Sequence, residues 1–149
     1  EDIQVITPSR KGSMGVIELN QQLQAVLNPK SVDKPECRSI LYTFREGDKV
    51  MQIKNNYDII WHKDGENGTG IFNGDIGYLR PLNRQGQEVI AEFDGRRATY
   101  PLEQLDQLEL AYAVTVHKSQ GSEFQAVVMP LLGGFPKLYY RNLLYTAVT

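Results

Sequence analysis

Apolar and polar positions at the start of the chain predict a strand followed by a helix. Residues 3–7 form a short β-rich run that ends at Pro8, which is typical of a strand. Apolar residues then recur at helical spacing, and Asn28, followed by a proline, ends the pattern. The recurring positions are Val16, Leu19, Leu23, Val26 and Leu27. A strand, a glycine-bearing loop and a helix in this order indicate the βα unit of an α/β domain.

The middle of the chain has a different pattern, with short β-like segments in close succession. They are KVMQI, YDIIW, IFNGDIGYL, EVIAEF and RATYP, in that order. Asp94-Gly95 between the last two is a strong signal for a two-residue hairpin turn. We interpret residues 62–70 as a glycine-rich loop, and Gly74 and Gly77 as marks of a bulge or bend. Short, closely spaced strands predict a small barrel or sandwich, which we place at residues 43–107.

The α/β pattern returns after residue 107. Residues 110–116 (LAYAVTV) are apolar on both faces, which predicts a central parallel strand, and residues 126–132 predict a second one. An apolar stripe within residues 140–148 predicts a helix. We therefore expect one α/β domain in two sequence pieces, residues 1–42 and 108–149, interrupted by the β barrel at 43–107.

Composition narrows the class of protein. The chain has 149 residues, is 41% hydrophobic and carries a formal charge of −2, which suits one domain or one domain with a small insert. It contains no apolar run of the ~20 residues that a membrane span needs, and no signal-peptide pattern. Cys37 is the only cysteine, so neither a disulfide framework nor a cysteine-based zinc site is expected. The expected location is the cytoplasm, with no membrane partner.

The slight acidity means that any contact with nucleic acid must be local. Three basic pairs are present: Arg10-Lys11, His62-Lys63 and Arg96-Arg97. Each pair by itself is read as a solvated surface. Both ends of the sequence look cut, because a strand begins almost at once and a helical pattern runs to the last residue, so we expect a piece of a larger protein.

Polar chemistry is concentrated in one turn, residues 117–123, between two apolar segments. In open parallel sheets, ligands bind beyond the carboxyl ends of the strands, and this turn lies at such an end. Backbone N–H groups with His, Lys and Ser side chains suit phosphate oxygens. Glu123 suits a ribose hydroxyl, and Gly121 permits a close approach of the backbone to a ligand. The alternative is an ordinary polar loop between a strand and a helix.

Several segments, in order along the chain, resemble motifs of superfamily 1 helicases of the RecD-like branch. Residues 113–124 (AVTVHKSQGSEF) resemble motif V, residues 142–149 (NLLYTAVT) resemble the start of motif VI, and residues 4–29 are similar to the motif IV region. Residues 47–58 and 72–77 resemble the SH3-like insert of that family. The resemblance covers nearly the whole chain. It implies a RecA-like (P-loop NTPase-type) domain 2A interrupted by an SH3-like β-barrel insert, domain 2B.

The resemblance also implies roles for residues of the turn. Four residues would face single-stranded DNA: Thr115, His117, Lys118 and Ser119. Gly121 and Glu123 would face ATP, with Glu123 on the ribose. Gln120 would couple the DNA-facing and ATP-facing residues, and it is counted among the nucleotide-binding candidates. Arg10, in the loop that resembles motif IV, is a further nucleotide-phosphate candidate, with a capping or surface role as its alternative.

No catalytic residue is assigned within the chain. In this family an arginine finger follows the motif VI segment, and it would come just beyond Thr149; Arg141 is read as surface or structural. Walker A and Walker B patterns are absent, so ATP with Mg²⁺ is expected in the intact parent, with no cofactor or metal bound by this chain alone. Residues 64–70 only faintly resemble a calcium loop and lack its closing glutamate.

The implied parent is an ATP-dependent 5′–3′ DNA helicase of DNA repair or recombination, in the family of the exodeoxyribonuclease V alpha subunit. Implied partners are single-stranded DNA, the N-terminal motor domain of the same protein and nuclease or helicase subunits. Two alternatives stay open: the helicase part of a conjugative relaxase, and a non-catalytic module that binds nucleic acid or protein. On the insert, Tyr57 and Trp61 are candidates for stacking on bases, with a place in the barrel core as the preferred reading for Trp61.

Overall fold

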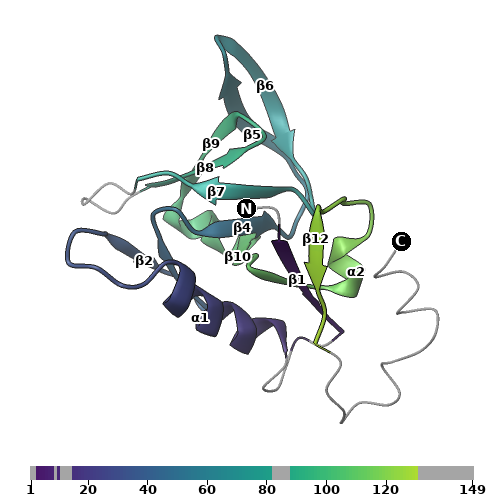
Figure 1. The fold of residues 1–149 in the computed structure, drawn as a ribbon. Coiled ribbons are helices and arrows are strands. Elements are labelled where there is room, and N and C mark those ends of the chain that lie inside the picture. Colours follow the sequence, from purple (N-terminus) through teal and green to yellow (C-terminus); the bar gives the residue numbers. More distant parts are fainter. Residues whose placement is uncertain (1–2, 9, 11–14, 82–87, 131–149) are drawn as a thin grey trace. The chain divides into compact units, whose positions relative to one another are not determined.

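The computed structural model of the chain describes residues 3–8, 10, 15–81 and 88–130 (Figure 1). The chain divides into two compact units. The first unit comprises Glu1–Leu23 and Tyr112–Thr149, and the second comprises Gln24–Ala111.

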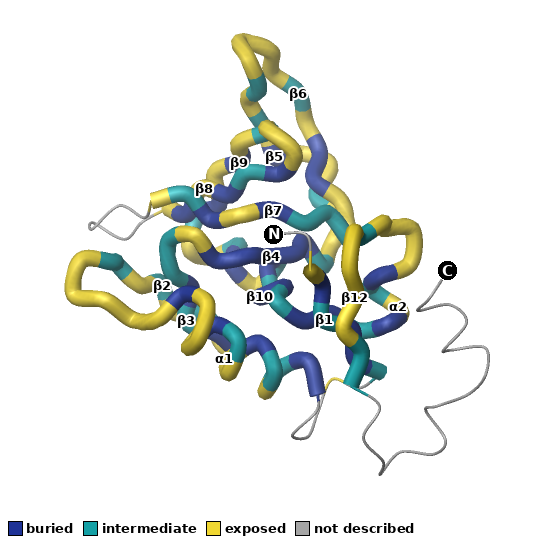
Figure 2. Tube along the Cα trace, in the orientation of Figure 1, coloured by how far each residue is buried: buried dark blue, intermediate teal, exposed yellow. Residues whose placement is uncertain are grey.

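The first unit contains a parallel sheet, whose described part has the strand order β11-β1-β12. The expected strand at residues 3–7 is confirmed as β1 (Ile3–Thr7). It pairs in parallel with β11 (Ala113–Thr115) on one side and with β12 (Ala126–Val128) on the other. All three residues of β12 are exposed (Figure 2). A parallel sheet with a helix confirms the predicted α/β class.

The expectation of one strand across residues 110–116 is wrong. The segment contains two strands in different sheets: β10 (Leu108–Leu110) is antiparallel to β4 in the second unit, and β11 is parallel to β1 in the first. Leu110, Ala113 and Val114 are all buried, so the run is apolar as expected of a core segment. Apolar character records burial alone, and it does not distinguish one long strand from two short ones that meet at a bend.

Helix α1 (Val16–Leu27) occupies the predicted helical segment, but its buried face is largely polar. Val26 and Leu27 are 77% and 64% exposed, whereas Asn20, Gln24 and, just after the helix, Asn28 are buried. These three amides recur every four residues and therefore share one face. Their side chains make hydrogen bonds to backbone or carboxylate groups, which compensates for their removal from water.

The second unit is built on an antiparallel sheet with the described strand order β10-β4-β7-β8-β9-β5-β6. A 3₁₀ helix, η1 (Leu102–Gln107), leads into β10, and a separate hairpin joins β2 (Glu36–Arg38) to β3 (Thr43–Arg45). The other strands are β4 (Lys49–Gln52), β5 (Asn56–Lys63), β6 (Glu66–Ile71), β7 (Ile76–Leu79), β8 (Glu88–Phe93) and β9 (Arg96–Pro101). Short strands with tight connections confirm the predicted β-rich middle of the chain.

The hairpin predicted at Asp94-Gly95 is confirmed, whereas the loop expected at residues 62–70 is wrong. Asp64 (φ 50°) and Gly65 (φ 81°) form a second two-residue turn, and the remaining glycines lie in strand β6. Gly68 pairs with Trp61, and a Cβ placed on Gly68 would lie 2.2 Å from the indole ring. The glycine is therefore a strand residue that makes room for tryptophan. Trp61 is half-buried by this contact.

A buried hydrogen-bond network joins strands of the second unit around Gln52. The Tyr100 hydroxyl donates to Gln52 Oε1 at 2.7 Å, and Gln52 Nε2 donates to Gln107 Oε1 at 3.0 Å. Burial, together with the nearby carboxylate of Asp75, raises the pKa of Tyr100 well above its usual range. The phenol therefore stays protonated and keeps its donor at physiological pH.

Asp48 is the centre of a second buried network, which links the end of α1 to β3. Its carboxylate accepts hydrogen bonds from Gln24 Nε2, Asn28 Nδ2 and the Arg45 backbone N–H, each at 2.7 Å. The residue itself has no exposed surface. Three donors to one carboxylate compensate for its removal from water.

Among the described residues, no helix is long and apolar enough to cross a membrane.

Replacement of Asp48 by alanine is expected to lower the free energy of unfolding by at least about 3 kcal/mol, because several buried donors lose their common acceptor. Asp58→Ala is the matched control: Asp58 is exposed, and we expect a change within about 0.5 kcal/mol. Urea unfolding followed by far-UV circular dichroism measures both. Equal effects of the two substitutions would contradict the role given to Asp48.

Candidate functional site

Two loops of the first unit leave the same edge of the parallel sheet. Thr7, the last residue of β1, is in register with Thr115, the last residue of β11. Arg10 follows the first strand in the sequence, and α2, in the predicted motif V turn, follows the second (Figure 1). The carboxyl edge of a parallel sheet is where ligands bind in open α/β folds. The structure thus brings the two predicted site segments to one edge.

A short helical turn, α2 (Val116–Ser119), gives the motif V segment a fixed backbone. Thr115 is its N-cap: Oγ1 accepts a hydrogen bond from the Lys118 backbone N–H at 3.2 Å. The Ser119 hydroxyl donates to the Val116 carbonyl at 2.6 Å, and Val116 is fully buried. Side-chain hydrogen bonds at both ends and a buried anchor hold the turn to the end of β11.

The DNA-contact candidates differ in what they present to solvent. His117 is exposed and Lys118 is partly exposed, so an imidazole and an ammonium group are accessible beside the turn. Ser119 is only 7% exposed and its hydroxyl donates within the turn, while the Thr115 hydroxyl accepts within it. In this geometry His117 and Lys118 provide the outward chemistry, and Thr115 and Ser119 shape the backbone that carries them. Their contact with DNA stays a prediction.

The nucleotide-contact candidates form an exposed run directly after α2. Gln120, Gly121 and Glu123 are all exposed. Gly121 has φ +82°, and no atom lies within 4 Å of a Cβ placed there, so conformation rather than crowding explains the glycine. Arg10 is exposed too, and its carbonyl accepts a hydrogen bond from the Ile17 N–H at 3.3 Å. Contact of these residues with a nucleotide stays a prediction.

Sequence reasoning missed Asn20, which holds the strand that leads into the turn. Its side-chain amide donates to the Ala113 carbonyl at 2.9 Å and accepts from the Ala113 N–H at 2.8 Å. One amide thereby satisfies both backbone groups of Ala113, as the next strand of a sheet would do. The available signal was the four-residue spacing of Asn20, Gln24 and Asn28, which is atypical of a solvated helix face.

The aromatic candidates of the second unit lie on and near the β5–β6 hairpin. Tyr57 is 67% exposed, and its ring packs edge-to-face on Phe72 with centroids 5.5 Å apart. Trp61 lies over Gly68, and the Arg96 guanidinium lies 5.7 Å from its ring centroid. Tyr57 is therefore the more accessible ring, and stacking on bases stays a prediction.

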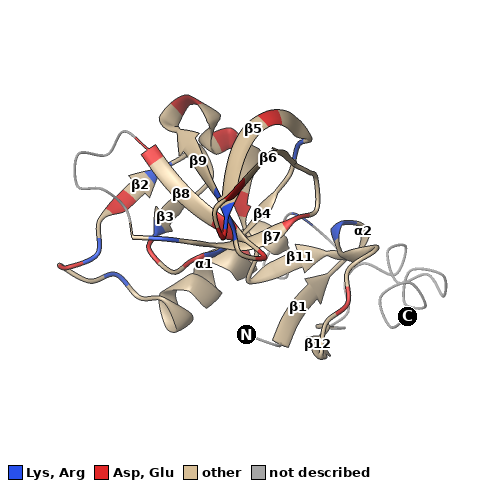
Figure 3. Ribbon diagram, turned by 90° about the horizontal axis from the view of Figure 1, so that it is seen from above, with Lys and Arg blue, Asp and Glu red and all other residues tan. Residues whose placement is uncertain are grey.

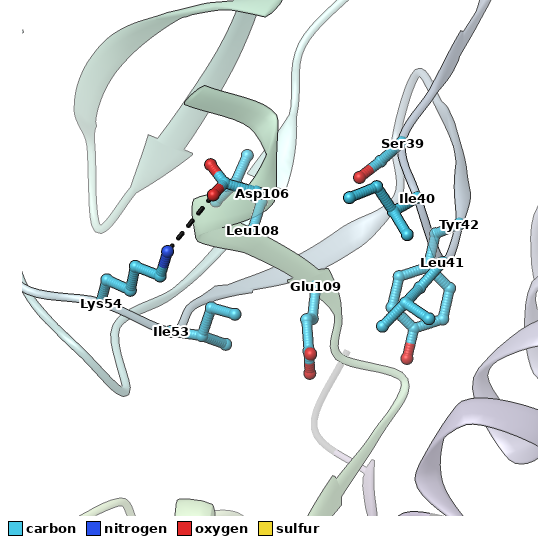
Figure 4. A pocket seen from close by; sticks show the side chains of 9 residues that line it. All are labelled: Ser39, Ile40, Leu41, Tyr42, Ile53, Lys54, Asp106, Leu108 and Glu109. Atoms are coloured by element: carbon cyan, nitrogen blue, oxygen red, sulfur yellow. Dashed lines mark hydrogen bonds and ion pairs between the residues drawn. The ribbon is translucent and has the colours of Figure 1, made fainter. Parts of the chain in front are cut away.

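An apolar hollow of about 220 Å³ lies elsewhere in the second unit, between residues 39–42 and 106–109 (Figure 4). Lys54 Nζ and Asp106 Oδ2 pair with each other at 3.2 Å at this hollow. The aliphatic side chains of Ile40, Leu41 and Ile53 face it. With its lysine already paired, this hollow is unsuited to phosphate.

The strands β1, β11 and β12 carry no charged residue, whereas α2 carries a lysine, as Figure 3 shows. Within the part of the chain that the structure describes, no group of three or more His, Cys, Asp or Glu side chains is placed to hold a metal ion. The predicted motif VI start, residues 142–149, together with Arg141 and the helix expected around them, lies outside the described residues.

Two family models match separate parts of the chain. A family model described as the SH3 domain of ATP-dependent RecD-like DNA helicases matches residues 19–93. A second, described as the UvrD-like helicase C-terminal domain, matches residues 110–149. These matches confirm the predicted SH3-like insert and helicase motor domain.

Curated relatives point to the same group. An ATP-dependent RecD2 DNA helicase of Deinococcus radiodurans is 37% identical over 147 residues, which is 99% of this chain and 18% of that protein. The RecBCD enzyme subunit RecD of Mycolicibacterium smegmatis is 28% identical, over 100% of this chain and 24% of the relative. The chain therefore spans about a fifth of the length of these relatives.

Solved structures share the fold at low sequence identity. A Bacteroides Pif1 structure with bound single-stranded DNA has a TM-score of 0.60 and 17% identity, and covers 98% of this chain and 37% of that one. Pif1 helicase from Candida albicans has a TM-score of 0.53 and 16% identity, and covers 99% and 42%. These likenesses establish the fold alone.

Replacement of Asn20 by alanine is expected to speed hydrogen exchange of the Ala113 amide and to lower the free energy of unfolding by about 2 kcal/mol, because two buried backbone groups lose their partner. Gln22→Ala, on an exposed position of the same helix, is the control and should leave both unchanged. Hydrogen exchange followed by NMR checks this. An unaltered Ala113 exchange rate would show that Asn20 does not brace the strand.

Proposed function

Because the chain belongs to the RecD-like DNA helicase family, we propose that it is the second motor domain, with its SH3-like insert, of an ATP-dependent 5′–3′ DNA helicase. The observation that carries this proposal is the capped turn after β11, which presents His117 and Lys118 beside the exposed run 120–123 at the carboxyl edge of the sheet. In the proposed division, domain 2A comprises residues 1–42 and 108–149, and domain 2B comprises residues 43–107.

Single-stranded DNA would bind along the turn through its phosphates. His117 and Lys118 are the outward groups, and contacts of this type fix position without reading sequence. The chain as a whole is slightly acidic, so the attraction arises from these local cations. A helicase that moves along any sequence needs this kind of contact.

The nucleotide would contact the next few residues of the chain. Glu123 would accept from the ribose, and Gln120, the Gly121 backbone and Arg10 would lie towards the phosphates. When bound in the intact parent, ATP with Mg²⁺ supplies the free energy of phosphoryl transfer to water. This chain contains no GxxxxGK[ST] sequence, so another part of the parent would supply the phosphate cradle. We propose that the chain by itself neither hydrolyses ATP nor unwinds DNA.

The short turn would couple the two ligands. Thr115 caps one end of α2, buried Val116 anchors it, and the nucleotide-facing run starts directly at its other end. A shift of the run on nucleotide binding would therefore move His117 and Lys118 as part of the same rigid turn. Opening and closing of the parent's two motor domains around ATP would turn such shifts into steps along DNA.

The parent is proposed to act in DNA repair or recombination in the cytoplasm, with its N-terminal motor domain and single-stranded DNA as partners. The name of the Mycolicibacterium relative, a subunit of the RecBCD enzyme, supports nuclease or helicase subunits as further partners. The same motifs would also serve the helicase part of a conjugative relaxase, and a nuclease-like region elsewhere in the parent would favour that reading.

In the intact parent, the double substitution His117→Ala and Lys118→Ala is expected to weaken binding of single-stranded DNA about tenfold or more, a decrease of ~1.4 kcal/mol in binding free energy. The salt dependence should become shallower, by a log–log slope of about 0.7 for each phosphate that is no longer neutralised. Fluorescence anisotropy at several salt concentrations measures both.

The matched control for this pair is His62→Ala with Lys63→Ala, the other His-Lys pair of the chain, which lies on β5. Weaker binding in the control alone would move the DNA-binding surface to the insert. That result would favour a binding module over a motor domain that tracks DNA through motif V.

Glu123→Gln in the parent is expected to raise the KM for ATP and to reduce DNA-stimulated hydrolysis, since a neutral amide is a weaker acceptor for a ribose hydroxyl than a carboxylate. Discrimination between ATP and its deoxyribose analogues should shrink as well. Glu103→Gln, on the exposed surface of η1, is the control. If the Glu123→Gln parent hydrolysed ATP at the wild-type rate and with wild-type stimulation by DNA, the assignment of Glu123 would be wrong.

A further inference from the structure

A basic hollow of about 520 Å³ lies in the second unit and shares no residue with the groups assigned above. It is formed by the β2–β3 hairpin and the segment that follows α1. Its lining residues are Lys30, Glu36, Arg38, Thr43 and Arg45. Three cationic side chains and one carboxylate give it a local charge of about +2 in a chain whose total is −2.

Arg45 is held in place for recognition by the groups around it. Its side chain is 14% exposed; Nε donates to Glu36 Oε1 at 3.0 Å, and Nη1 donates to the Asn28 carbonyl at 3.1 Å. These bonds use two of the five N–H groups of a guanidinium. The remaining donors belong to a side chain that has already lost its rotamer freedom, so a ligand need not order it.

Lys30 and Arg38 are the unbalanced charges of the hollow. Both are exposed, and neither has a hydrogen bond or ion pair within the described residues. By contrast, Lys54 and Arg80 each lie within 4 Å of a carboxylate oxygen, at 3.2 and 3.8 Å. The charge of this hollow is therefore not neutralised by the described part of the protein.

The walls of the hollow are part of the Asp48 network. The Asp48 carboxylate accepts from the Arg45 backbone N–H, and Gln24 Nε2 donates to the Thr43 carbonyl, each at 2.7 Å. Strand β3 is thus tied to α1 at both of the positions that line the hollow. The backbone that carries Thr43 and Arg45 is therefore fixed, and Arg45 is presented to a ligand in one position.

We infer that this hollow binds the sugar-phosphate backbone of DNA, as a second contact separate from the turn after β11. The fixed guanidinium of Arg45, the exposed cations of Lys30 and Arg38, and the Thr43 hydroxyl form a donor set suited to phosphate oxygens. The volume of the hollow, about 520 Å³, exceeds that of a single phosphate and suits a stretch of the DNA backbone. The inference goes beyond the proposed function, because it adds an anchoring surface that does not contact the nucleotide.

The test is the double substitution Lys30→Ala with Arg38→Ala in the intact parent helicase. We expect affinity for DNA to fall about five- to tenfold, and the log–log salt slope to become shallower by about 1 to 2. The matched control, Lys54→Ala with Arg80→Ala, removes the same charge from cations that are already paired, and should change affinity less than about twofold. Single-stranded and duplex oligonucleotides, assayed separately by anisotropy, show which form the hollow holds.

Glu36→Gln provides a change in the opposite direction, which misfolding cannot imitate. The amide oxygen still accepts from Arg45 Nε, but the only negative charge of the hollow is removed. Affinity for the form of DNA that the hollow holds should rise, and the KM for ATP should stay constant. A fall in affinity would overturn the inference.

Two further outcomes separate this inference from the proposed function. If the hollow is an independent binding surface, substitutions there and at His117 and Lys118 should lower affinity by factors that multiply. Weakened binding in the hollow variant with normal binding in the turn variant would refute the motif V track and leave the hollow standing. The inference would be overturned if the hollow variant bound both forms of DNA with wild-type affinity at every salt concentration. It would also be overturned if the paired-cation control lost as much affinity as the hollow variant.

Discussion

The buried carboxylate of Asp48 is the constraint on which the junction of α1 with strand β3 depends. A charge without exposed surface is tolerable only if donors surround it, and here Gln24, Asn28 and the Arg45 backbone supply them. Each of those donors must be held in one position, so the last turn of α1 and the strand β3 are fixed together. Lys34 Nζ extends the network by donating to Asn28 Oδ1 at 2.6 Å. Polar bonding, rather than apolar packing, therefore determines how this helix end meets the sheet.

The same physical device recurs in the first unit. Asn20 pairs with both backbone groups of Ala113, and Gln4, which is fully buried, donates to the Tyr112 carbonyl. Side-chain amides thus complete the hydrogen bonding of a strand only three residues long. A short strand braced in this way gives a firm base to the turn that follows it. The exposed groups of that turn can then act on ligands without disturbing the sheet.

The two surfaces proposed to meet DNA differ in construction. The turn after β11 presents a few groups at the end of a strand, next to residues proposed to contact nucleotide, which suits a contact that changes during a cycle. The hollow at β2–β3 is braced by Asp48 and has no assigned link to nucleotide. This arrangement suits a DNA contact that stays the same throughout the ATP cycle. Both proposed contacts use local cations in a chain whose total charge is −2, so the proposal rests on where charge is concentrated and not on its total.

The sequence by itself determined the α/β class, the strand at Ile3–Thr7, the helix at Val16–Leu27 and the Asp94-Gly95 turn, because each rests on local propensity, periodicity or turn chemistry. The order of residues 113–124, read as a motif, also located the candidate site. Only the tertiary structure decided that the run after residue 107 forms strands of two different sheets. It also showed that the amides of α1 are buried, whereas Val26 and Leu27 are exposed. Those outcomes depend on partners distant in the chain, such as Ala113 for Asn20 and Asp48 for Gln24, and no local pattern records which partner a buried polar group will find.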